Sequence, residues 1–171
     1  EIGGYTLGER IGSGAFGVVM AARRAEAEVA IKILHARHQD DAKLRSRFAT
    51  EARAGLALRH PNIVRVHSDG TLEDGRPYLV MERLEGETLE QRLGREGRLS
   101  LEDALPILAA VAGALDAGHD AGIVHRDVKP GNVLLAKTER GIVFKLFNFN
   151  ITKILTPKIT HNHQTHTNST I

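Results

Sequence analysis

Three glycines at a fixed spacing form the first group of residues that could bind a ligand, in the pattern Gly12-x-Gly14-x-x-Gly17-x-Val19. Glycine allows the backbone to approach phosphate groups closely and to adopt positive φ angles. A dinucleotide-binding turn has the same spacing but requires a helix after the glycines. Residues 18–21 read Val-Val-Met-Ala, which favours a strand. We therefore expect a hairpin flap over a nucleotide, with a flexible hairpin that binds nothing as the alternative.

A lysine and a glutamate further along the chain could provide a charge for those phosphates. Lys32 ends the apolar run Val29-Ala30-Ile31, and Glu51 lies on the predicted inner face of the following helix. Burying an unpaired carboxylate is costly, so Glu51 needs a partner. An ion pair with Lys32 would satisfy it and would direct the ammonium group toward phosphate oxygens. The simpler interpretation is that Lys32 only ends a strand and binds neither Glu51 nor phosphate.

The most specific pattern is a run of eight residues, His125-Arg126-Asp127-Val128-Lys129-Pro130-Gly131-Asn132. It follows a long predicted helix and precedes a predicted hairpin. Eight such residues in this order and in this context rarely arise by chance. The run therefore favours a catalytic loop over an exposed charged loop without function.

The elements that must position these residues fall into two regions. The first is predicted to be a mostly antiparallel sheet with one helix against it, built from strands 5–11, 18–22, 29–34, 63–66 and 78–81 and helix 40–59. The second contains a short helix over 88–93, a long helix that Ser100 opens and Gly122 ends, and a hairpin of 133–135 with 142–146. The sequence thus predicts an α+β fold.

Helical periodicity predicts which side chains of the two longer helices face inward. On helix 40–59 they are Leu44, Phe48, Ala52 and either Gly55 or Leu56. On the helix that follows Ser100 they are Leu101, Leu105, Leu108, Val111, Ala112 and Leu115.

Composition limits the classes of function. The chain has 171 residues, 42% of them apolar, which suffices for one core. Its net charge of +2 is too small to indicate a nucleic-acid or membrane surface. With no cysteine, neither disulfides nor cysteine-built metal sites are possible. Without an apolar run of membrane length, we expect a cytoplasmic location, although a parent protein could carry an anchor elsewhere.

The three motifs, taken in this order, resemble those of protein kinases, and the resemblance covers residues 5 to about 147. Lys129, two residues after Asp127, is similar to the serine/threonine type, and residues 60–90 and 120–135 resemble the bacterial members of the family. The resemblance implies a kinase-like fold, with a five-stranded antiparallel N-lobe sheet, one helix, and the start of a helical C-lobe. It also implies ATP and Mg²⁺ as ligands and a protein with Ser or Thr as substrate.

Specific roles follow from the same resemblance. Asp127 would orient the substrate hydroxyl and accept its proton, Lys129 would steady the transferred group, and Lys32 would hold phosphates while Glu51 braces it. Asn132 and Asn148 would be the metal ligands. The ATP pocket would comprise Ile11, Gly12, Gly14, Gly17, Val19, Ala30, Lys32, Met81, Glu82 and Leu84, the last two through backbone hydrogen bonds to adenine.

The chain departs from the family pattern at Asn148-Phe149-Asn150, where Asp-Phe-Gly is expected. An amide brings no negative charge to magnesium, so a large loss of catalytic rate is expected. The alternative to an active kinase is therefore a catalytically impaired, pseudokinase-like fragment that acts as an interaction module, or a non-functional truncation.

Three segments are expected: 1–84 as the N-lobe and hinge, 85–147 as a partial C-lobe with the catalytic loop, and 148–171 as a degenerate activation segment with a disordered tail. The chain opens at Glu1 and stops within the expected activation segment, so we expect a piece of a longer protein. Residues 148–171 lack Ala, Asp, Glu, Gly and Val, whose codons all begin with G. A G-to-A change in the gene would explain this composition, and intact G-rich codons in the gene would contradict it.

Overall fold

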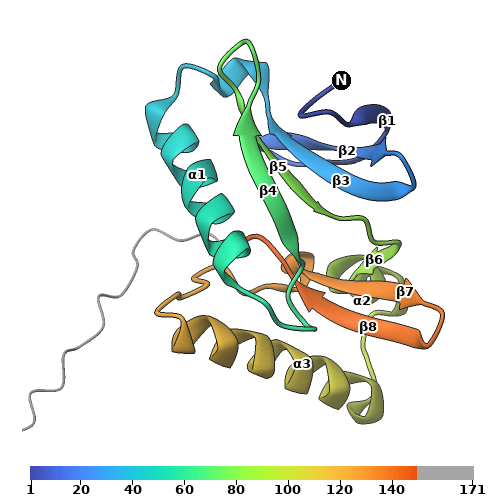
Figure 1. Ribbon diagram of the computed structural model, residues 1–171. Helices are drawn as coiled ribbons and strands as arrows, with labels where there is room; N and C mark the ends of the chain where they lie inside the picture. Colours follow the sequence, from blue (N-terminus) through green and yellow to red (C-terminus); the bar gives the residue numbers. More distant parts are fainter. Residues whose placement is uncertain (150–171) are drawn as a thin grey trace, which may run out of the picture.

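The computed structural model describes residues 1–149 and contains two antiparallel sheets, one above the other (Figure 1). The upper sheet has five strands in the order β1-β2-β3-β5-β4. They are β1 (Thr6–Ser13), β2 (Gly17–Arg24), β3 (Ala27–Leu34), β4 (Val66–Thr71) and β5 (Pro77–Glu82). The predicted five-stranded antiparallel sheet is confirmed.

Alternation along these strands gives the upper sheet two apolar faces, because successive side chains point to opposite sides. The outer face buries Ile31, Ile33 and Val80 among neighbours from the first strands. The N-terminal segment covers this cluster through Ile2 and Tyr5, whose backbones exchange hydrogen bonds of 2.9 and 3.0 Å. The opposite face remains available for the helix and for the candidate site.

Helix α1 (Ala42–Ala57) packs against that opposite face (Figure 1). The Oδ1 atom of Asp41 caps its first turn by accepting from the backbone N–H groups of Lys43 and Leu44 at 3.0 Å. Phe48 and Ala52 pack on Leu34 and Leu79 of the sheet. The helix is thus two residues shorter at each end than the predicted span of 40–59.

Gly55 allows the close approach of α1 to the sheet. A Cβ atom on Gly55 would lie 2.2 Å from Cγ2 of Val66 in β4. Gly55 is buried whereas Leu56 is exposed, so the inner face of α1 continues through the glycine.

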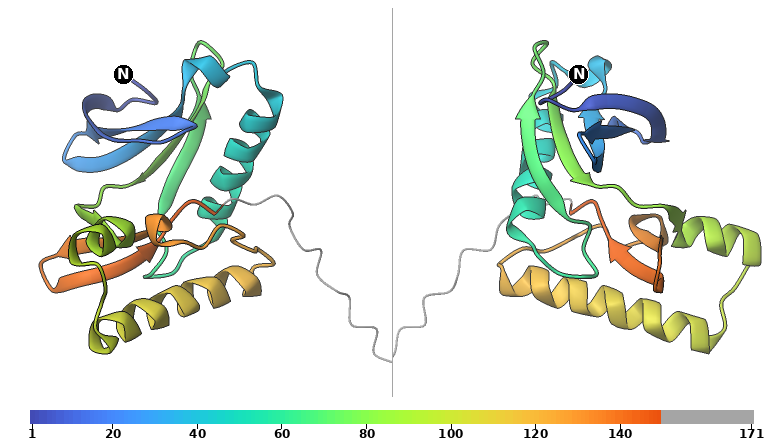
Figure 2. Two further views of the ribbon diagram at one scale, coloured as in Figure 1. Left: turned by 180° about the vertical axis from the view of Figure 1, so that it is seen from behind. Right: turned by 45° about the vertical axis from the view of Figure 1, so that its right-hand side comes forward.

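The lower region combines a small sheet with two helices (Figure 2). Its strands pair in the order β6-β7-β8 and are β6 (Gly86–Thr88), β7 (Val133–Thr138) and β8 (Gly141–Leu146). Helix α2 (Leu89–Glu96) begins with a capping box between Thr88 and Gln91, and helix α3 (Leu101–Asp120) begins at the Ser100 cap. Two 3₁₀ turns complete the described elements, Ala36–His38 and Pro130–Asn132. Strand β6 was absent from the predicted elements.

The segment between α1 and β4 joins the two sheets. Ile63 forms an isolated parallel bridge with Leu146 of β8, and the backbone N–H of Val64 donates to the Leu146 carbonyl at 2.9 Å. The prediction of a sheet strand over 63–66 is therefore wrong, because β4 begins only at Val66. Lys145 of β8 adds an ion pair of 2.6 Å to Glu82 at the end of β5.

Helix α3 turns a different face inward from the predicted one. Ile107, Ala114 and Gly118 are buried, whereas Leu101, Leu105 and Leu108 are 73%, 54% and 62% exposed and Ala112 is also exposed. Val111 and Leu115 pack partly against the core, as predicted. The helix is apolar nearly all round, so periodicity could not select its buried face. Within residues 1–149 no helix is both long and apolar enough to cross a membrane.

Candidate active site

The ammonium group of Lys32 lies at the centre of the polar contacts between the two sheets. Its Nζ atom is 2.6 Å from Oε1 of Glu51 on α1 and 3.0 Å from Oδ1 of Asn148, which follows β8. The Lys32 and Glu51 side chains are mostly buried, so this pair is only weakly screened by solvent. The predicted pairing of the two residues is present, and a third residue joins it.

Asn148 extends this contact to the loop after α3. Its Nδ2 donates to Oδ1 of Asn132 at 3.1 Å, and the Asn132 Nδ2 donates to the carbonyl oxygen and Oδ2 of Asp127 at 2.7 and 3.0 Å. Lys129 Nζ closes the series at 3.0 Å from the same Asp127 oxygen. One unbroken chain of polar contacts thus connects all six predicted catalytic and metal-binding residues.

One residue of this chain of contacts, and one neighbour of another, have unusual backbone conformations. Asn148 has φ 60° and Arg126, next to Asp127, has φ 62°. Left-handed conformations are uncommon for residues other than glycine and cluster at sites where the surroundings hold them in place. Asparagine tolerates this region better than most residues. One strained position is thus within the network, and the other directly precedes Asp127.

The buried side chain of His125 holds the loop around Asp127 in place. It is 1% exposed, its Nε2 lies 3.0 Å from the Phe147 carbonyl, and its Nδ1 accepts from the backbone N–H of Asp127 at 3.2 Å. These partners require a neutral ring with its proton on Nε2. Burial lowers the pKa of His125, which agrees with the neutral form. The ring of Phe149 packs 4.7 Å away from that of His125.

The carboxylate of Asp127 is held in its charged form. The hydrogen bond from Lys129 lowers the pKa of Asp127 most strongly, and the bond from Asn132 lowers it further against the opposing effect of burial. Ionised at neutral pH, Asp127 is an acceptor of hydrogen bonds and of protons.

The two asparagine amides have defined orientations. Lys32 is a donor only, so Asn148 must present its oxygen to Lys32 and its Nδ2 to Asn132. Asn132 must in turn present its Nδ2 to Asp127 and its oxygen to Asn148. Both amide oxygens therefore already accept hydrogen bonds.

This donor set does not fit a divalent cation well. Magnesium favours carboxylate oxygens, and both predicted ligands are neutral amides whose oxygens are engaged. Among residues 1–149, no group of three or more His, Cys, Asp or Glu residues is arranged to hold a metal. The metal-binding role of Asn132 and Asn148 stays a prediction, and the contacts do not favour it.

The predicted ATP-pocket residues of the upper sheet share one face. In the strand register Val19 lies opposite Lys32, and Ala30 lies opposite Met81, all on the α1 side of the sheet. The flap between β1 and β2 ends at Gly17, where a Cβ atom would lie 2.4 Å from the Ile33 carbonyl oxygen. Glycine at this position permits the flap to return directly onto β3.

The remaining residues of the predicted ATP pocket lie at the end of β1 and around the end of β5. Gly12 is opposite Val19 in the register, and Ile11 lies where the β1–β2 pairing shifts and is half exposed. The Glu82 side chain turns away toward the Arg65 N–H and Lys145, at 2.8 and 2.6 Å, and the Glu82 N–H donates to the Arg65 carbonyl. Leu84 is partly buried just beyond β5.

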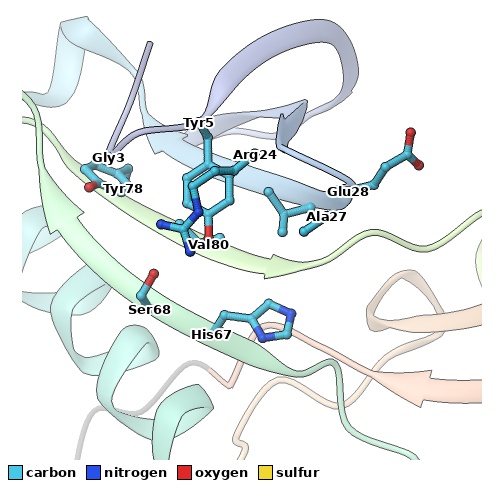
Figure 3. Close-up of a pocket in the computed structure, with 10 residues that line it drawn as sticks. Gly3, Tyr5, Arg24, Ala27, Glu28, His67, Ser68, Tyr78 and Val80 are labelled. Carbon is cyan, nitrogen blue, oxygen red and sulfur yellow. The ribbon is translucent and has the colours of Figure 1, made fainter.

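A separate hollow of about 570 Å³ lies on the outer face of the upper sheet (Figure 3). Tyr5 and Arg24 stand on one side of it and His67 and Ser68 of β4 on the other. None of the predicted site residues is among the described residues that line this hollow. We place the candidate site at the polar contacts, because the charged and strained residues gather there.

The family model for the protein kinase domain matches residues 5–169. The chain belongs to the protein kinase family. The kinase PknA of Mycobacterium tuberculosis, named as a serine/threonine-protein kinase, is 42% identical over 157 residues, which cover 88% of this chain and 36% of PknA. The probable serine/threonine-protein kinase PknB of Bifidobacterium longum is 37% identical over 163 residues, 90% of this chain and 23% of PknB.

Solved kinase structures have the same fold. The crystal structure of the M. tuberculosis PknI kinase domain aligns with a TM-score of 0.77 and 31% identity, covering 90% of this chain and 62% of that domain. The protein kinase fold with a partial C-lobe is thus confirmed. Both relatives, PknA and PknB, are named as serine/threonine-protein kinases, and the chain spans about a third or less of their length.

The sequence-based prediction omitted two features of this candidate site. His125 was part of the recognised motif but had no assigned role, because its backbone partners become adjacent only in the folded chain. His35, Arg37 and His38, after β3, contact the glycine flap through its carbonyl groups. Contacts to backbone carbonyls leave no side-chain pattern in the flap, so the sequence offered nothing by which to predict them.

Proposed function

We propose that the chain binds the triphosphate of ATP beside the polar contacts between the two sheets, as the nucleotide-binding part of a serine/threonine protein kinase. The observation that carries the proposal is the unbroken series of contacts Glu51–Lys32–Asn148–Asn132–Asp127–Lys129. It brings together residues from β3, α1, the catalytic loop and the end of β8.

Two cations in this series suit the binding of an anionic ligand. Lys32 is oriented by Glu51 at 2.6 Å, and the exposed Lys129 lies at the other end of the network. Preorganised positive charges that face one cleft stabilise phosphate groups, with little reorganisation when these bind. The glycine flap covers the same side of the sheet and offers backbone N–H groups.

The transfer step proposed for the parent kinase uses the other end of the network. The oxygen of a Ser or Thr hydroxyl attacks the γ-phosphorus of ATP, the bond to the ADP oxygen breaks, and the hydroxyl proton passes to Asp127. The lowered pKa of Asp127 keeps it ionised to orient the hydroxyl. Lys129, 3.0 Å from that carboxylate, faces the charge that develops on the transferred group.

Asn148 favours a second candidate for this chain, namely nucleotide binding with little phosphoryl transfer and little dependence on magnesium. Its Nδ2–H fills the 3.1 Å gap to the Asn132 oxygen. An aspartate at position 148 would bring a second acceptor oxygen to that of Asn132, and a bound cation would then offset the negative charge of the aspartate. The amide of Asn148 thus occupies the place where a metal would be needed.

Calorimetric titration with ATP, in magnesium and in EDTA, tests both candidates on the chain and on Asn148→Asp. A control, Ala109→Glu, adds the same charge on the exposed side of α3. We expect the chain and the control to bind ATP equally in both buffers. The Asn148→Asp variant should bind about tenfold or more tightly in magnesium than in EDTA, because two facing oxygens then form a cation site.

Transfer of labelled phosphate to a Ser/Thr-rich protein is measured on the same three proteins. Transfer that only Asn148→Asp supports would establish an impaired kinase. Transfer by the chain itself at rates typical of kinases would contradict the role given to Asn148. Failure of the chain and of Asn148→Asp to bind ATP in either buffer would contradict the proposed nucleotide site.

A further inference from the structure

The tip of the glycine flap is held by side chains from a segment that no kinase motif includes. Nε2 of His35 lies 3.0 Å from the carbonyl oxygen of Gly14. Nη2 of Arg37 donates to the Ala15 carbonyl at 3.0 Å, and Nε2 of His38 lies 3.2 Å from the same oxygen. Three side chains from the connection between β3 and α1 thus converge on two consecutive carbonyl groups.

The flap itself provides little else to hold its tip. A Cβ atom on Gly14 would meet no atom of the described residues within 4 Å, and Phe16 is 48% exposed. Inside the turn, the Gly14 N–H donates to the Gly17 carbonyl at 2.9 Å. The backbone N–H of His35 donates to the Phe16 carbonyl at 2.9 Å, which ties the flap to the same connection.

The contacts on the Ala15 carbonyl are redundant. His38 Nε2 is 3.2 Å from both the Ala15 oxygen and Arg37 Nε, an acceptor and a donor. When Nε2 of His38 carries the proton it donates to the Ala15 oxygen, and when it does not it accepts from Nε of Arg37. Arg37 Nη2 reaches the Ala15 oxygen independently of that choice. The carbonyl therefore keeps a donor in either tautomer of His38.

The position of these three residues connects the flap to the charged pair. They follow Lys32 on the way from β3 to α1, and α1 carries Glu51. The connection spans only residues 35–41 and is braced by its own 3₁₀ turn. The segment that contacts the flap tip therefore lies between Lys32 and Glu51 in the chain.

We propose that His35, Arg37 and His38, named here the linker clasp, position the glycine flap over the bound nucleotide and slow the release of that nucleotide. The inference rests on the proposed nucleotide site. The clasp residues are positioning residues, since they act through the flap backbone.

The test compares two triple variants. The first variant, His35→Leu/Arg37→Leu/His38→Leu, removes every side-chain donor of the clasp. The second variant, His35→Gln/Arg37→Lys/His38→Gln, keeps a donor near each position, because the amide nitrogen of glutamine lies close to the place of the histidine Nε2. His67→Leu removes an exposed histidine from β4 as a control. Millisecond hydrogen exchange of residues 12–17 without nucleotide and the dissociation rate of ATP in EDTA are measured on each.

We expect the leucine variant to exchange its flap amides about three- to tenfold faster and to release ATP faster by a similar factor, because several exposed hydrogen bonds are lost. The glutamine–lysine variant and the control should stay within twofold of the original chain. Unchanged exchange in the leucine variant would overturn the clasp. Faster exchange with unchanged ATP release would overturn its positioning role.

The proposed nucleotide site is judged separately. If the original chain binds no ATP, the proposed function fails, and so does the link from clasp to nucleotide. Flap exchange, which is measured without nucleotide, still decides whether the three side chains hold the flap.

Discussion

His125 links the catalytic loop to the end of β8 through two backbone groups, and its neutral form is required for both bonds. A protonated Nδ1 could no longer accept from the Asp127 N–H. The loop geometry around Asp127 therefore depends on one ring staying uncharged.

This dependence predicts a loss of stability in acid. Because burial lowers the pKa of His125 below its ordinary value of 6.5, the unfolded chain binds a proton first as the pH falls. Stability should be lost as the pH drops from about 7 through the folded pKa, by up to about 1.4 kcal/mol per pH unit for one proton. Urea unfolding between pH 7 and 5 measures this slope.

The variant His125→Gln provides the comparison, since an amide donates to Phe147 without titrating. Its stability should fall less steeply over the same pH range. An identical slope in both proteins would show that other groups cause the acid sensitivity.

Motif spacing predicted which residues converge on the site but not all of their contacts. Lys32, Glu51, Asp127 and Asn132 were expected together, because the order of three motifs identified the family. Asn148 was predicted as a metal ligand that lacks the expected charge. Its bridge to Asn132 was not predicted, since the sequence shows the lost charge but not the amide hydrogen that faces Asn132.

At the scale of elements, glycines determine how closely α1 and the flap approach the sheet. Gly55 on α1 faces Val66 and Gly17 faces the backbone of β3. Larger residues at these places would move whole elements, and α1 carries Glu51.

Gly55→Ala should therefore destabilise the fold by about 1–3 kcal/mol, because its methyl group would overlap Val66. The matched change Gly94→Ala, in the exposed helix α2 where a Cβ meets no described atom within 4 Å, should stabilise by about 0.4–1 kcal/mol. Denaturant unfolding of both variants gives the two free energies. Equal effects would mean that α1 moves away from the sheet without cost.

Elements with one clear apolar face were predicted correctly. A segment that pairs with a strand of the other sheet was not. The first three strands were predicted from short apolar runs between tight turns, and α1 from its helical repeat. Residues 63–66 look like a sheet strand, but Ile63 pairs with Leu146 of the other sheet. Helix α3 has apolar residues on several faces, so only packing decides that Ile107 is buried and Leu108 is not.

At the scale of the whole molecule, the exposed leucines of α3 are expected to promote aggregation of the chain. Leu101, Leu105 and Leu108 form an apolar stripe along one side of the helix, at a spacing of three to four residues. Exposed apolar patches promote association between copies.

Replacing Leu105 and Leu108 with glutamine should reduce aggregation of the chain and change its melting temperature little, because both side chains lie mostly in solvent. Ile107→Ala, one position away but buried, should cost about 2–4 kcal/mol. Light scattering and thermal unfolding separate the two effects. A large loss of stability in the glutamine variant would show that these leucines are covered.

The central claim is that nucleotide phosphates meet Lys32 and Lys129 in one cleft, and an acyl-phosphate derivative of ATP tests it most directly. Such a reagent transfers its acyl group to lysines beside the bound phosphates and releases ATP, and peptide mass spectrometry locates the modified residues. We predict acylation of Lys32 and Lys129, which an excess of ATP prevents. Acylation spread over lysines such as Lys43 and Lys137, or unaffected by ATP, would contradict the account.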